Sequence, residues 1–188
     1  MARLIQEIVI PPPPPLPPNP KANSSRSTIS LRTKKSEPPT RADSVPKGTE
    51  PPFEPCSFFF YGSLMDPEVL QAVLELSEMP IVESGYVGGF IMKMWGIYPA
   101  LIPHEGGGVL GSAWRVSSES QFLRLKEYET SAYTSCACDI ELSNGEVLRG
   151  CRTFCWAGDS DSKELDEGTF DLQRYQRYFK ASVVRKSP

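Results

Sequence analysis

The sequence predicts an α+β domain, a small mixed β-barrel flanked by a few helices, preceded by a disordered proline-rich tail. Two observations predict this fold. Of the 19 prolines, 14 precede Cys56, and a segment of that composition cannot bury enough apolar surface to offset the entropy of ordering. The rest of the chain holds many short aromatic, glycine-rich and β-branched segments but few helical patterns. A sheet of many strands is expected to curl into a barrel, because closure eliminates open edges.

The tail is predicted to comprise residues 1–54 and the folded domain residues 55–188. The tail contains five consecutive prolines, Pro11 to Pro15, and a run rich in Ser, Thr, Arg and Lys from Asn23 to Lys35. Both features are typical of disordered segments. The remaining chain of about 130 residues is long enough to bury roughly two-thirds of its extended surface.

Charge and hydropathy exclude several classes of function. Before residue 55 there are eight Lys and Arg against five Asp and Glu, and the domain has twelve against eighteen. Neither part has the concentrated basic surface that nucleic-acid binding requires. No apolar run approaches the roughly 20 residues of a membrane span. Gln6, Glu7 and the proline block interrupt the N-terminus, which argues against a secretion signal or an amphipathic transit peptide. We therefore expect a cytoplasmic protein.

The domain is predicted to begin with a strand, a tight loop and a helix. Residues 56–61 form a short aromatic run bounded by proline and glycine, which is typical of a buried strand. The strand stops at Gly62. Asp66 then supplies an N-cap and Pro67 the first helical position. A helix is expected to follow, because apolar residues repeat after Pro67 with helical spacing.

Three further strands and two further helices are expected. Residues 81–87, 90–95 and 109–116 are rich in glycine, aromatic and β-branched residues and are predicted to be strands. Ser117 or Ser118 is expected to cap the second helix, with Gln121 completing a capping box. A short closing helix is expected after Gly168.

A long hairpin is predicted from residues of about 133–142 and 146–156. If Asn144-Gly145 forms a two-residue turn, Cys138 lies directly opposite Cys151. A cross-strand disulfide or metal pair is then geometrically feasible. The alternative is that the cysteines are small buried hydrophobes. It is favoured because the following residues alternate onto one face of the hairpin: Cys136, Cys138, Ile140, Leu142, Val147, Cys151 and Cys155.

Most cofactor chemistry lacks support in the sequence. His104 is the only histidine, and it lies just before three glycines, a context that predicts an exposed loop residue. No cluster of His, Cys, Asp or Glu has the spacing of metal ligands, and no phosphate-loop or dinucleotide motif occurs. We therefore expect neither a metal nor an organic cofactor.

The loop Tyr61-Gly62-Ser63-Leu64 is a candidate binding site. A glycine after a buried strand lets backbone approach a ligand closely, and consecutive free N–H groups form an anion-binding concavity. The positive end of the helix that begins near Pro67 is expected to assist. A carboxylate would suit such a site. Strand-to-helix turns of this kind are common, so the loop alone does not decide between binding and a structural role.

Glu129 is the candidate acid/base. It follows Phe122 by seven residues and Leu125 by four, so on a helix it lies within the apolar stripe. A carboxyl group facing a core must be hydrogen-bonded, paired or raised in pKa, and a raised pKa is what a general base near neutral pH requires. If instead the helix frays at Tyr128, Glu129 is a solvated residue at its end.

An ordered set of motifs resembles the gamma-glutamylcyclotransferase-like family. The motifs span nearly all of residues 56–179, and they are Phe60 to Met65, Pro67 to Leu70, Tyr98 to Leu101, Gly111 to Trp114, Leu125 to Glu129, and Tyr133. The resemblance implies a small β-barrel flanked by helices, with Tyr61, Gly62, Ser63 and Leu64 binding a γ-glutamyl group and Glu129 as acid/base. It also brings Tyr98 and Tyr133 into the expected substrate-binding set.

The implied reaction is the cyclisation of a γ-glutamyl amide to 5-oxoproline with release of an amine. The substrate carries its own nucleophile, so one carboxylate can move both protons. Two positions depart from the family pattern: Lys126 stands where many members have an acid, and Thr134-Ser135 where a basic residue is frequent. Both departures bear on the identity of the leaving group.

Two other functions remain open at this stage. The same fold can serve as an inactive binder of a carboxylate-bearing metabolite. Alternatively the chain acts through its tail, where Pro11 to Pro18 is expected to form a polyproline II helix that docks on an SH3, WW or profilin-type partner. A flexible linker is the simpler interpretation of the tail.

Overall fold

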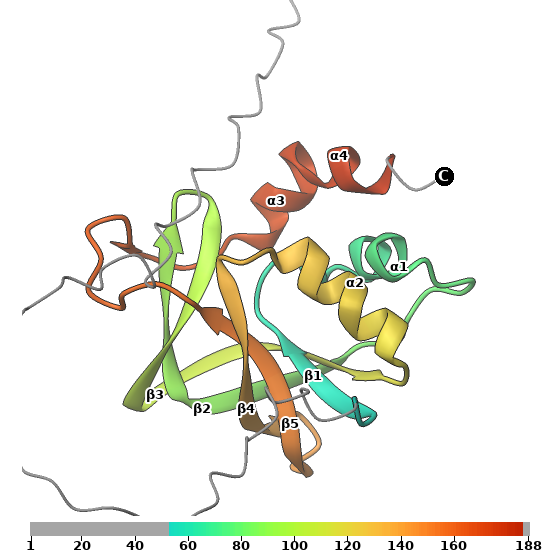
Figure 1. Ribbon diagram of the computed structural model, residues 1–188, viewed down its shortest axis with the longest axis horizontal. Coiled ribbons are helices and arrows are strands. Elements are labelled where there is room, and N and C mark those ends of the chain that lie inside the picture. The colour runs from blue at the N-terminus through green and yellow to red at the C-terminus, as the bar shows by residue number, and fades with distance from the viewer. Residues whose placement is uncertain (1–52, 186–188) are drawn as a thin grey trace, which may run out of the picture.

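The computed structural model describes residues 53–185, and the expected tail lies outside them except for Phe53 and Glu54. The ring of Phe53 stacks on that of Phe122, 5.2 Å between centroids. The elements shown in Figure 1 follow in chain order. They are β1 (Cys56–Phe60), η2 (Ser63–Met65), α1 (Pro67–Leu74), β2 (Glu83–Trp95), β3 (Tyr98–Val116), α2 (Glu119–Glu129), β4 (Tyr133–Leu142), β5 (Val147–Trp156), β6 (Asp166–Glu167), α3 (Leu172–Tyr178) and α4 (Lys180–Val184).

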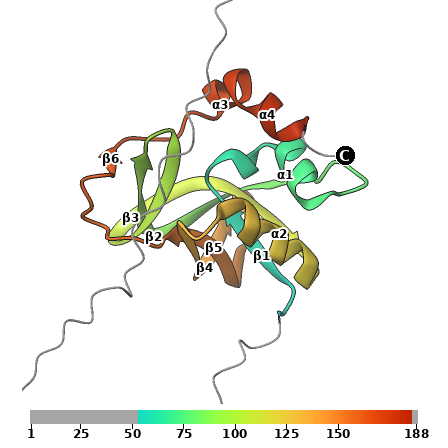
Figure 2. The same cartoon turned by 45° about the horizontal axis from the view of Figure 1, so that its top comes forward.

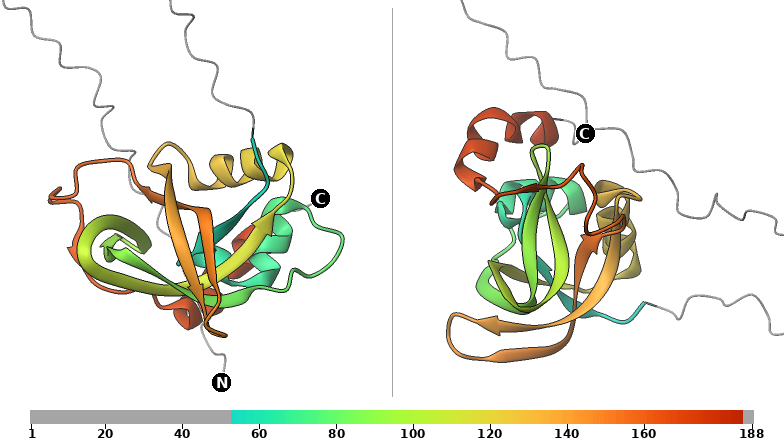
Figure 3. Two further views of the ribbon diagram at one scale, coloured as in Figure 1. Left: turned by 90° about the horizontal axis from the view of Figure 1, so that it is seen from below. Right: turned by 90° about the vertical axis from the view of Figure 1, so that its left-hand side faces the viewer.

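The sheet closes into a mixed barrel, as predicted. Its strand order is β3-β1-β5-β4-β2-β6, and β3 also pairs with β2, so the first five strands form a ring (Figure 3). The β1–β5 pair is parallel. All other pairs are antiparallel. The helices gather on one side of the barrel, with α3 and α4 above α1 (Figure 2).

Two very long strands, β2 and β3, replace the three short ones expected between residues 81 and 116. Strand β2 continues through a register shift between Gly88 and Phe90, and β3 includes His104 and the three glycines after it. His104 is exposed, as expected, but the prediction of a loop was wrong. Glycine is required there because a Cβ at Gly107 would meet Phe90 O and one at Gly108 the Tyr86 ring. These glycines permit close strand approach and do not terminate the strand.

The hairpin β4–β5 pairs Cys138 with Cys151, as predicted, although by a different route. The turn holds three residues, because Leu142 N–H donates to Glu146 O at 2.8 Å. A register shift between Cys138 and Ile140 compensates for the extra residue. All five cysteines are free.

The same register shift corrects the predicted faces of β5. Val147 was expected on the core face of the hairpin, but its side chain is 48% exposed. Leu148 packs against the barrel core instead. Alternation along a strand reverses across a bulge, and the sequence pattern alone does not reveal where that occurs.

Strand β1 separates two parts of the core, which explains its aromatic run. Phe59 packs inside the barrel. Phe58 and Phe60 point the other way and join Leu70 and Leu125 in a cluster beneath the helices. Because both faces of β1 are buried, the strand is aromatic throughout and does not alternate with polar residues.

Local signals fix the helix boundaries. Asp66 is the N-cap of α1 and Ser118 that of α2, as predicted. Gln121 N–H donates to Ser118 Oγ at 3.3 Å, but the Gln121 side chain accepts from Ser117 N–H at 2.8 Å, one residue before the cap, so the predicted capping box forms only in part. The single closing helix is in fact two, α3 and α4, which meet at Phe179. Among the described residues, no helix is long and apolar enough to cross a membrane.

Candidate functional site

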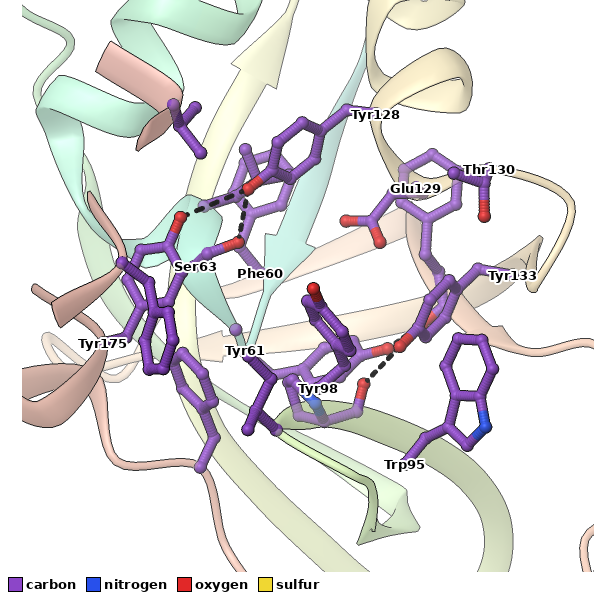
Figure 4. A pocket seen from close by; sticks show the side chains of 18 of the residues that line it. Phe60, Tyr61, Ser63, Trp95, Tyr98, Tyr128, Glu129, Thr130, Tyr133 and Tyr175 are labelled. Carbon is purple, nitrogen blue, oxygen red and sulfur yellow. Dashed lines mark hydrogen bonds between the residues drawn. The ribbon is translucent and has the colours of Figure 1, made fainter. Parts of the chain in front are cut away.

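A cavity of about 440 Å³ opens where the end of β1, the β2–β3 turn, the end of α2 and the helices α3 and α4 meet. Figure 4 shows the side chains that point into it. All seven residues that the sequence singled out line this cavity: Tyr61, Gly62, Ser63, Leu64, Tyr98, Glu129 and Tyr133. The fold therefore brings together residues from four separate parts of the chain.

The loop after β1 forms one side of the cavity. Tyr61 is buried, and its hydroxyl donates to Phe154 O at 2.7 Å. Gly62 packs so closely that a Cβ there would lie 2.9 Å from Pro99 Cγ. The glycine is thus required by packing against the protein itself.

The loop continues into the single turn η2. Met65 N–H donates to Gly62 O at 3.0 Å and Asp66 N–H to Ser63 O at 3.1 Å. The first N–H groups of such a turn, those of Ser63 and Leu64, have no acceptor within it. Both residues line the cavity, so these are the donors that a bound anion can use.

The expected contribution of the α1 N-terminus was wrong. The Asp66 side chain accepts hydrogen bonds from Glu68 N–H at 2.9 Å and Val69 N–H at 3.2 Å. Asp66 is 1% exposed, and it also binds Lys180 Nζ at 2.9 Å. None of these residues lines the cavity. The positive end of α1 is therefore satisfied by the protein's own carboxylate.

Hydroxyl groups form a chain along the cavity that sequence reasoning missed. Ser63 Oγ and Tyr128 Oη are 2.8 Å apart and share a hydrogen bond. Tyr128 Oη lies 3.5 Å from Tyr175 Oη (Figure 4). Burial raises the pKa of Tyr128, so this phenol is neutral. The spacing of Tyr128 after Leu125 could have placed it on the inward stripe of α2, but nothing local indicates its contact with Tyr175.

Glu129 ends α2 and points into the cavity (Figure 4). Because Glu129 is the last residue of the helix, the alternative in which the helix frays at Tyr128 does not hold. Its side chain is half-buried and, within residues 53–185, has no hydrogen bond or ion pair. Burial raises the pKa of this carboxyl to about 8. Thr130 then turns the chain away with a φ of 63°, a strained conformation for a β-branched residue.

Tyr98 and Tyr133 form the side of the cavity next to Glu129. The Tyr133 hydroxyl donates to Pro99 O at 3.0 Å, and its ring meets Trp156 edge-on, 6.0 Å between centroids. Tyr98 lies against Trp95, 6.3 Å between centroids. Burial raises the pKa of both tyrosines. Their hydroxyl groups stay neutral at physiological pH.

The opposite side comes from the last two helices and the segment before them. We call it the C-terminal wall, and it consists of Phe170, Tyr175, Phe179 and Val183. The Tyr175 ring lies 5.8 Å from that of Phe170 and 6.2 Å from that of Phe179. The sequence predicted a closing helix here but gave no sign that it would line the site.

The two departures from the expected pattern, Lys126 and Ser135, lie outside this cavity. Both line a second cavity of about 600 Å³. Thr130, Tyr133 and Phe154 line both cavities, so the two cavities adjoin. That Lys126 and Ser135 bear on the leaving group stays a prediction.

The described residues offer no group of three or more His, Cys, Asp and Glu side chains that could hold a metal ion. His104 and the five cysteines are absent from the lining of the first cavity. The ionisable chemistry of that cavity comes from Glu129 and the tyrosines.

Known proteins resemble this chain over the same region. A family model described as gamma-glutamyl cyclotransferase, AIG2-like, matches residues 58–176. AIG2-like protein C of Arabidopsis thaliana is 25% identical over 128 residues, which cover 67% of this chain and 72% of the relative. Two solution structures from the same plant share the fold. One has a TM-score of 0.54 at 19% identity, covering 73% of this chain and 82% of its own. The other has a TM-score of 0.52 at 24% identity, and the match covers 71% of this chain and 88% of the chain in that structure.

Proposed function

The chain belongs to the gamma-glutamyl cyclotransferase, AIG2-like family, and from this premise we propose that it cyclises a γ-glutamyl amide to 5-oxoproline and releases an amine. One observation carries the proposal. An unpaired carboxyl of raised pKa, Glu129, lines the same cavity as the backbone donors of the loop after β1.

The loop supports recognition of the glutamyl end. The N–H groups of Ser63 and Leu64 would donate to the substrate α-carboxylate, as N–H groups at the start of a helical turn do for anions. The Ser63 hydroxyl is held in place by Tyr128 at 2.8 Å. The substrate would thus be fixed in a folded conformer with its α-amine facing its own γ-carbonyl, which removes much of the entropic cost of ring closure.

The reaction needs only proton transfers from the protein. The α-nitrogen bonds to the γ-carbon, and the bond from the γ-carbon to the amide nitrogen breaks. Glu129 takes one proton from the α-ammonium before attack and gives it to the departing nitrogen. The ring nitrogen loses its second proton to the released amine, which departs as an ammonium ion. Atoms and charges balance without a co-reactant.

The raised pKa of Glu129 suits this task. A carboxyl of ordinary pKa near 4.3 is too weak a base to deprotonate an ammonium group efficiently. Burial raises the pKa of Glu129 to about 8, close to that of an α-amine. Proton transfer in both directions is then nearly balanced in free energy.

The test is a panel of γ-glutamyl amides with detection of 5-oxoproline, in wild type and Glu129→Gln. We expect wild type to form 5-oxoproline and the variant to lose about 10²- to 10⁴-fold in kcat. Glu127→Gln is the matched control, because Glu127 lies on the same helix but is exposed and absent from the cavity. Equal turnover by wild type and Glu129→Gln would contradict the mechanism. Binding of the amides without any 5-oxoproline would favour an inactive binder on the same fold.

A further inference from the structure

We propose that the second cavity binds the phosphoryl group of a small phosphate monoester, at a site formed by Lys126, Arg152 and Ser135. The cavity has a volume of about 600 Å³, within the range of roughly 300 to 1,000 Å³ that is typical of small-molecule sites. Lys126 and Ser135 are also positions at which the sequence departs from the family pattern. Phosphate binding there is independent of the proposed function, which uses the first cavity.

Two cations meet at the ring of Phe122. Lys126 Nζ lies 5.6 Å and Arg152 Cζ lies 5.8 Å from the centroid of this ring. The two residues come from different elements, α2 and β5, and both line the cavity. Within residues 53–185 the side chain of Arg152 has no hydrogen bond or ion pair. Its guanidinium group can therefore donate to two oxygens of one ligand.

The Ser135 hydroxyl is an uncharged donor beside Arg152. Ser135 pairs with Phe154 across the β4–β5 hairpin, so Arg152 is its diagonal neighbour on the same face of the sheet. Ser135 lines the cavity, and its Oγ is buried without a hydrogen-bond partner among the described residues. A buried hydroxyl without a partner is destabilising. A ligand oxygen that enters the cavity would satisfy it.

The charges of the lining favour a dianion. Lys126 and Arg152 carry two positive charges, and the one acid among the described lining residues is Glu119, about two helical turns before Lys126 on α2. Ser131 and Thr134 add further hydroxyl groups. The domain has eighteen acids against twelve bases, so this group of cations is a local exception to its charge. A phosphoryl group, with about two negative charges and three acceptor oxygens, matches these donors better than a carboxylate.

The remaining surface of the cavity is largely apolar, which indicates the kind of molecule that carries the phosphoryl group. Its apolar and aromatic members are Phe53, Phe122, Leu123, Tyr133 and Phe154. The Leu123 side chain is 54% exposed, and Phe53 is half-buried. A ligand with its phosphoryl group at the cations would bury its own apolar surface against these side chains. We therefore expect a monoester with an apolar body to bind more tightly than inorganic phosphate.

Calorimetric titration of the full-length chain with phenyl phosphate and with inorganic phosphate provides the test. We expect phenyl phosphate to bind about 5- to 20-fold more tightly than inorganic phosphate. Arg152→Gln should weaken the binding of phenyl phosphate about tenfold or more, because hydrogen bonds between charged groups are the strong ones. Arg115→Gln is the matched control, since Arg115 is exposed on β3 of the same sheet but does not line the cavity. It should leave the affinity unchanged.

Ser135→Ala separates binding from stability. The variant removes a hydroxyl that has no partner among the described residues, so the free energy of unfolding without ligand should not fall. The affinity for phenyl phosphate should nevertheless fall about two- to fivefold, because one donor to the ligand is lost. Unchanged affinity would exclude the Ser135 hydroxyl from the site.

Amide chemical shifts of the isotope-labelled protein locate the ligand. Phenyl phosphate should perturb Thr134, Ser135 and Arg152 most strongly. Perturbations centred on Ser63 and Leu64 would place the anion in the first cavity and overturn the proposal. The absence of binding by either phosphate, or equal affinity in Arg152→Gln and wild type, would also overturn it. Equal affinities of wild type for the two phosphates would overturn the monoester and identify inorganic phosphate as the ligand.

Discussion

Two carboxyl groups, Asp66 and Glu129, lie within the same small domain in opposite environments. Asp66 is buried with a full set of partners: two backbone N–H groups, Gln176 Nε2 at 2.7 Å and Lys180 Nζ at 2.9 Å. Glu129 faces the cavity without any partner among residues 53–185. The first arrangement is typical of a structural acid and the second of an acid that carries out chemistry.

The pKa directions express the same contrast. Burial by itself would raise the pKa of Asp66, but the hydrogen bonds from Lys180, Gln176 and Val69 N–H lower it below its ordinary value. For Glu129 burial acts alone and raises the pKa to about 8. The hydrogen-bond and charge partners of each carboxyl group, and not its burial, decide whether its pKa is lowered or raised.

The largest effect on stability is expected from Asp66→Asn. The change removes the charge that pairs with Lys180, which is only 20% exposed, and it weakens the cap of α1. We expect a loss of about 3 kcal/mol in the free energy of unfolding, measured by urea denaturation. Asp171→Asn, at the exposed cap of α3, should cost about 1 kcal/mol or less. Similar losses in both variants would contradict a structural role peculiar to Asp66.

Local sequence signals predicted where Asp66 and Glu129 lie on their helices, but they could not predict the partners of Asp66. The Asp66-Pro67 cap is a sequence-local motif, and so is the position of Glu129 on the apolar stripe of α2. The partners of Asp66 come from residues 110 and more positions away, Gln176 and Lys180. No periodicity encodes such contacts. The expectation that the α1 N-terminus would serve the ligand was wrong because the local cap, Asp66, already accepts from the N–H groups of Glu68 and Val69.

The barrel shows the same division between local and distant information. Aromatic and β-branched segments predicted the strands, and closure predicted the barrel. The full length of β3 was missed because glycines are ordinarily strand breakers, whereas here Gly107 lies against Phe90 O. The face of Val147 was missed because a register shift reverses the alternation. Both errors arise from contacts between strands that are distant in sequence or irregularly paired.

The second effect concerns the pH dependence of stability in Glu129→Gln. The pKa of Glu129 is higher in the folded state than in the unfolded state, where it is near 4.3. The contribution of this carboxyl to the free energy of unfolding is therefore complete below pH 4.3 and is lost as the pH rises through about 8. Wild type should therefore be less stable than Glu129→Gln at pH 9, by about 1–3 kcal/mol. The two proteins should have similar free energies of unfolding at pH 4. A difference that is independent of pH would indicate altered packing.

Asp66 should show the opposite sign at acid pH. Its folded pKa is lowered, so its contribution to stability is present above the unfolded pKa, near 3.9, and is lost as the pH falls through the folded pKa. The acid limb of the stability profile should be shallower in Asp66→Asn than in wild type. Urea denaturation between pH 2 and pH 6 measures this, and an unchanged limb would exclude Asp66 as a source of acid instability.

The smallest effect is expected from Tyr128→Phe. The variant keeps the ring and loses the hydroxyl that joins Ser63 at 2.8 Å and Tyr175 at 3.5 Å. We expect a loss of about 1 kcal/mol in the free energy of unfolding. KM for a γ-glutamyl amide should rise because Ser63 loses its orienting partner, and kcat should fall less. Tyr178→Phe, at an exposed position absent from the cavity, is the control and should change neither quantity.

The most direct test of the account is the pH dependence of kcat/KM for wild type with a γ-glutamyl amide. If Glu129 moves the protons, the profile rises with pH along a limb centred near 8, where this carboxyl ionises. It falls again where the substrate amine, titrated separately in solution, loses its proton. A rising limb near pH 4.3, or a profile without any rising limb between pH 5 and pH 9, would contradict the assignment of Glu129 as the acid/base.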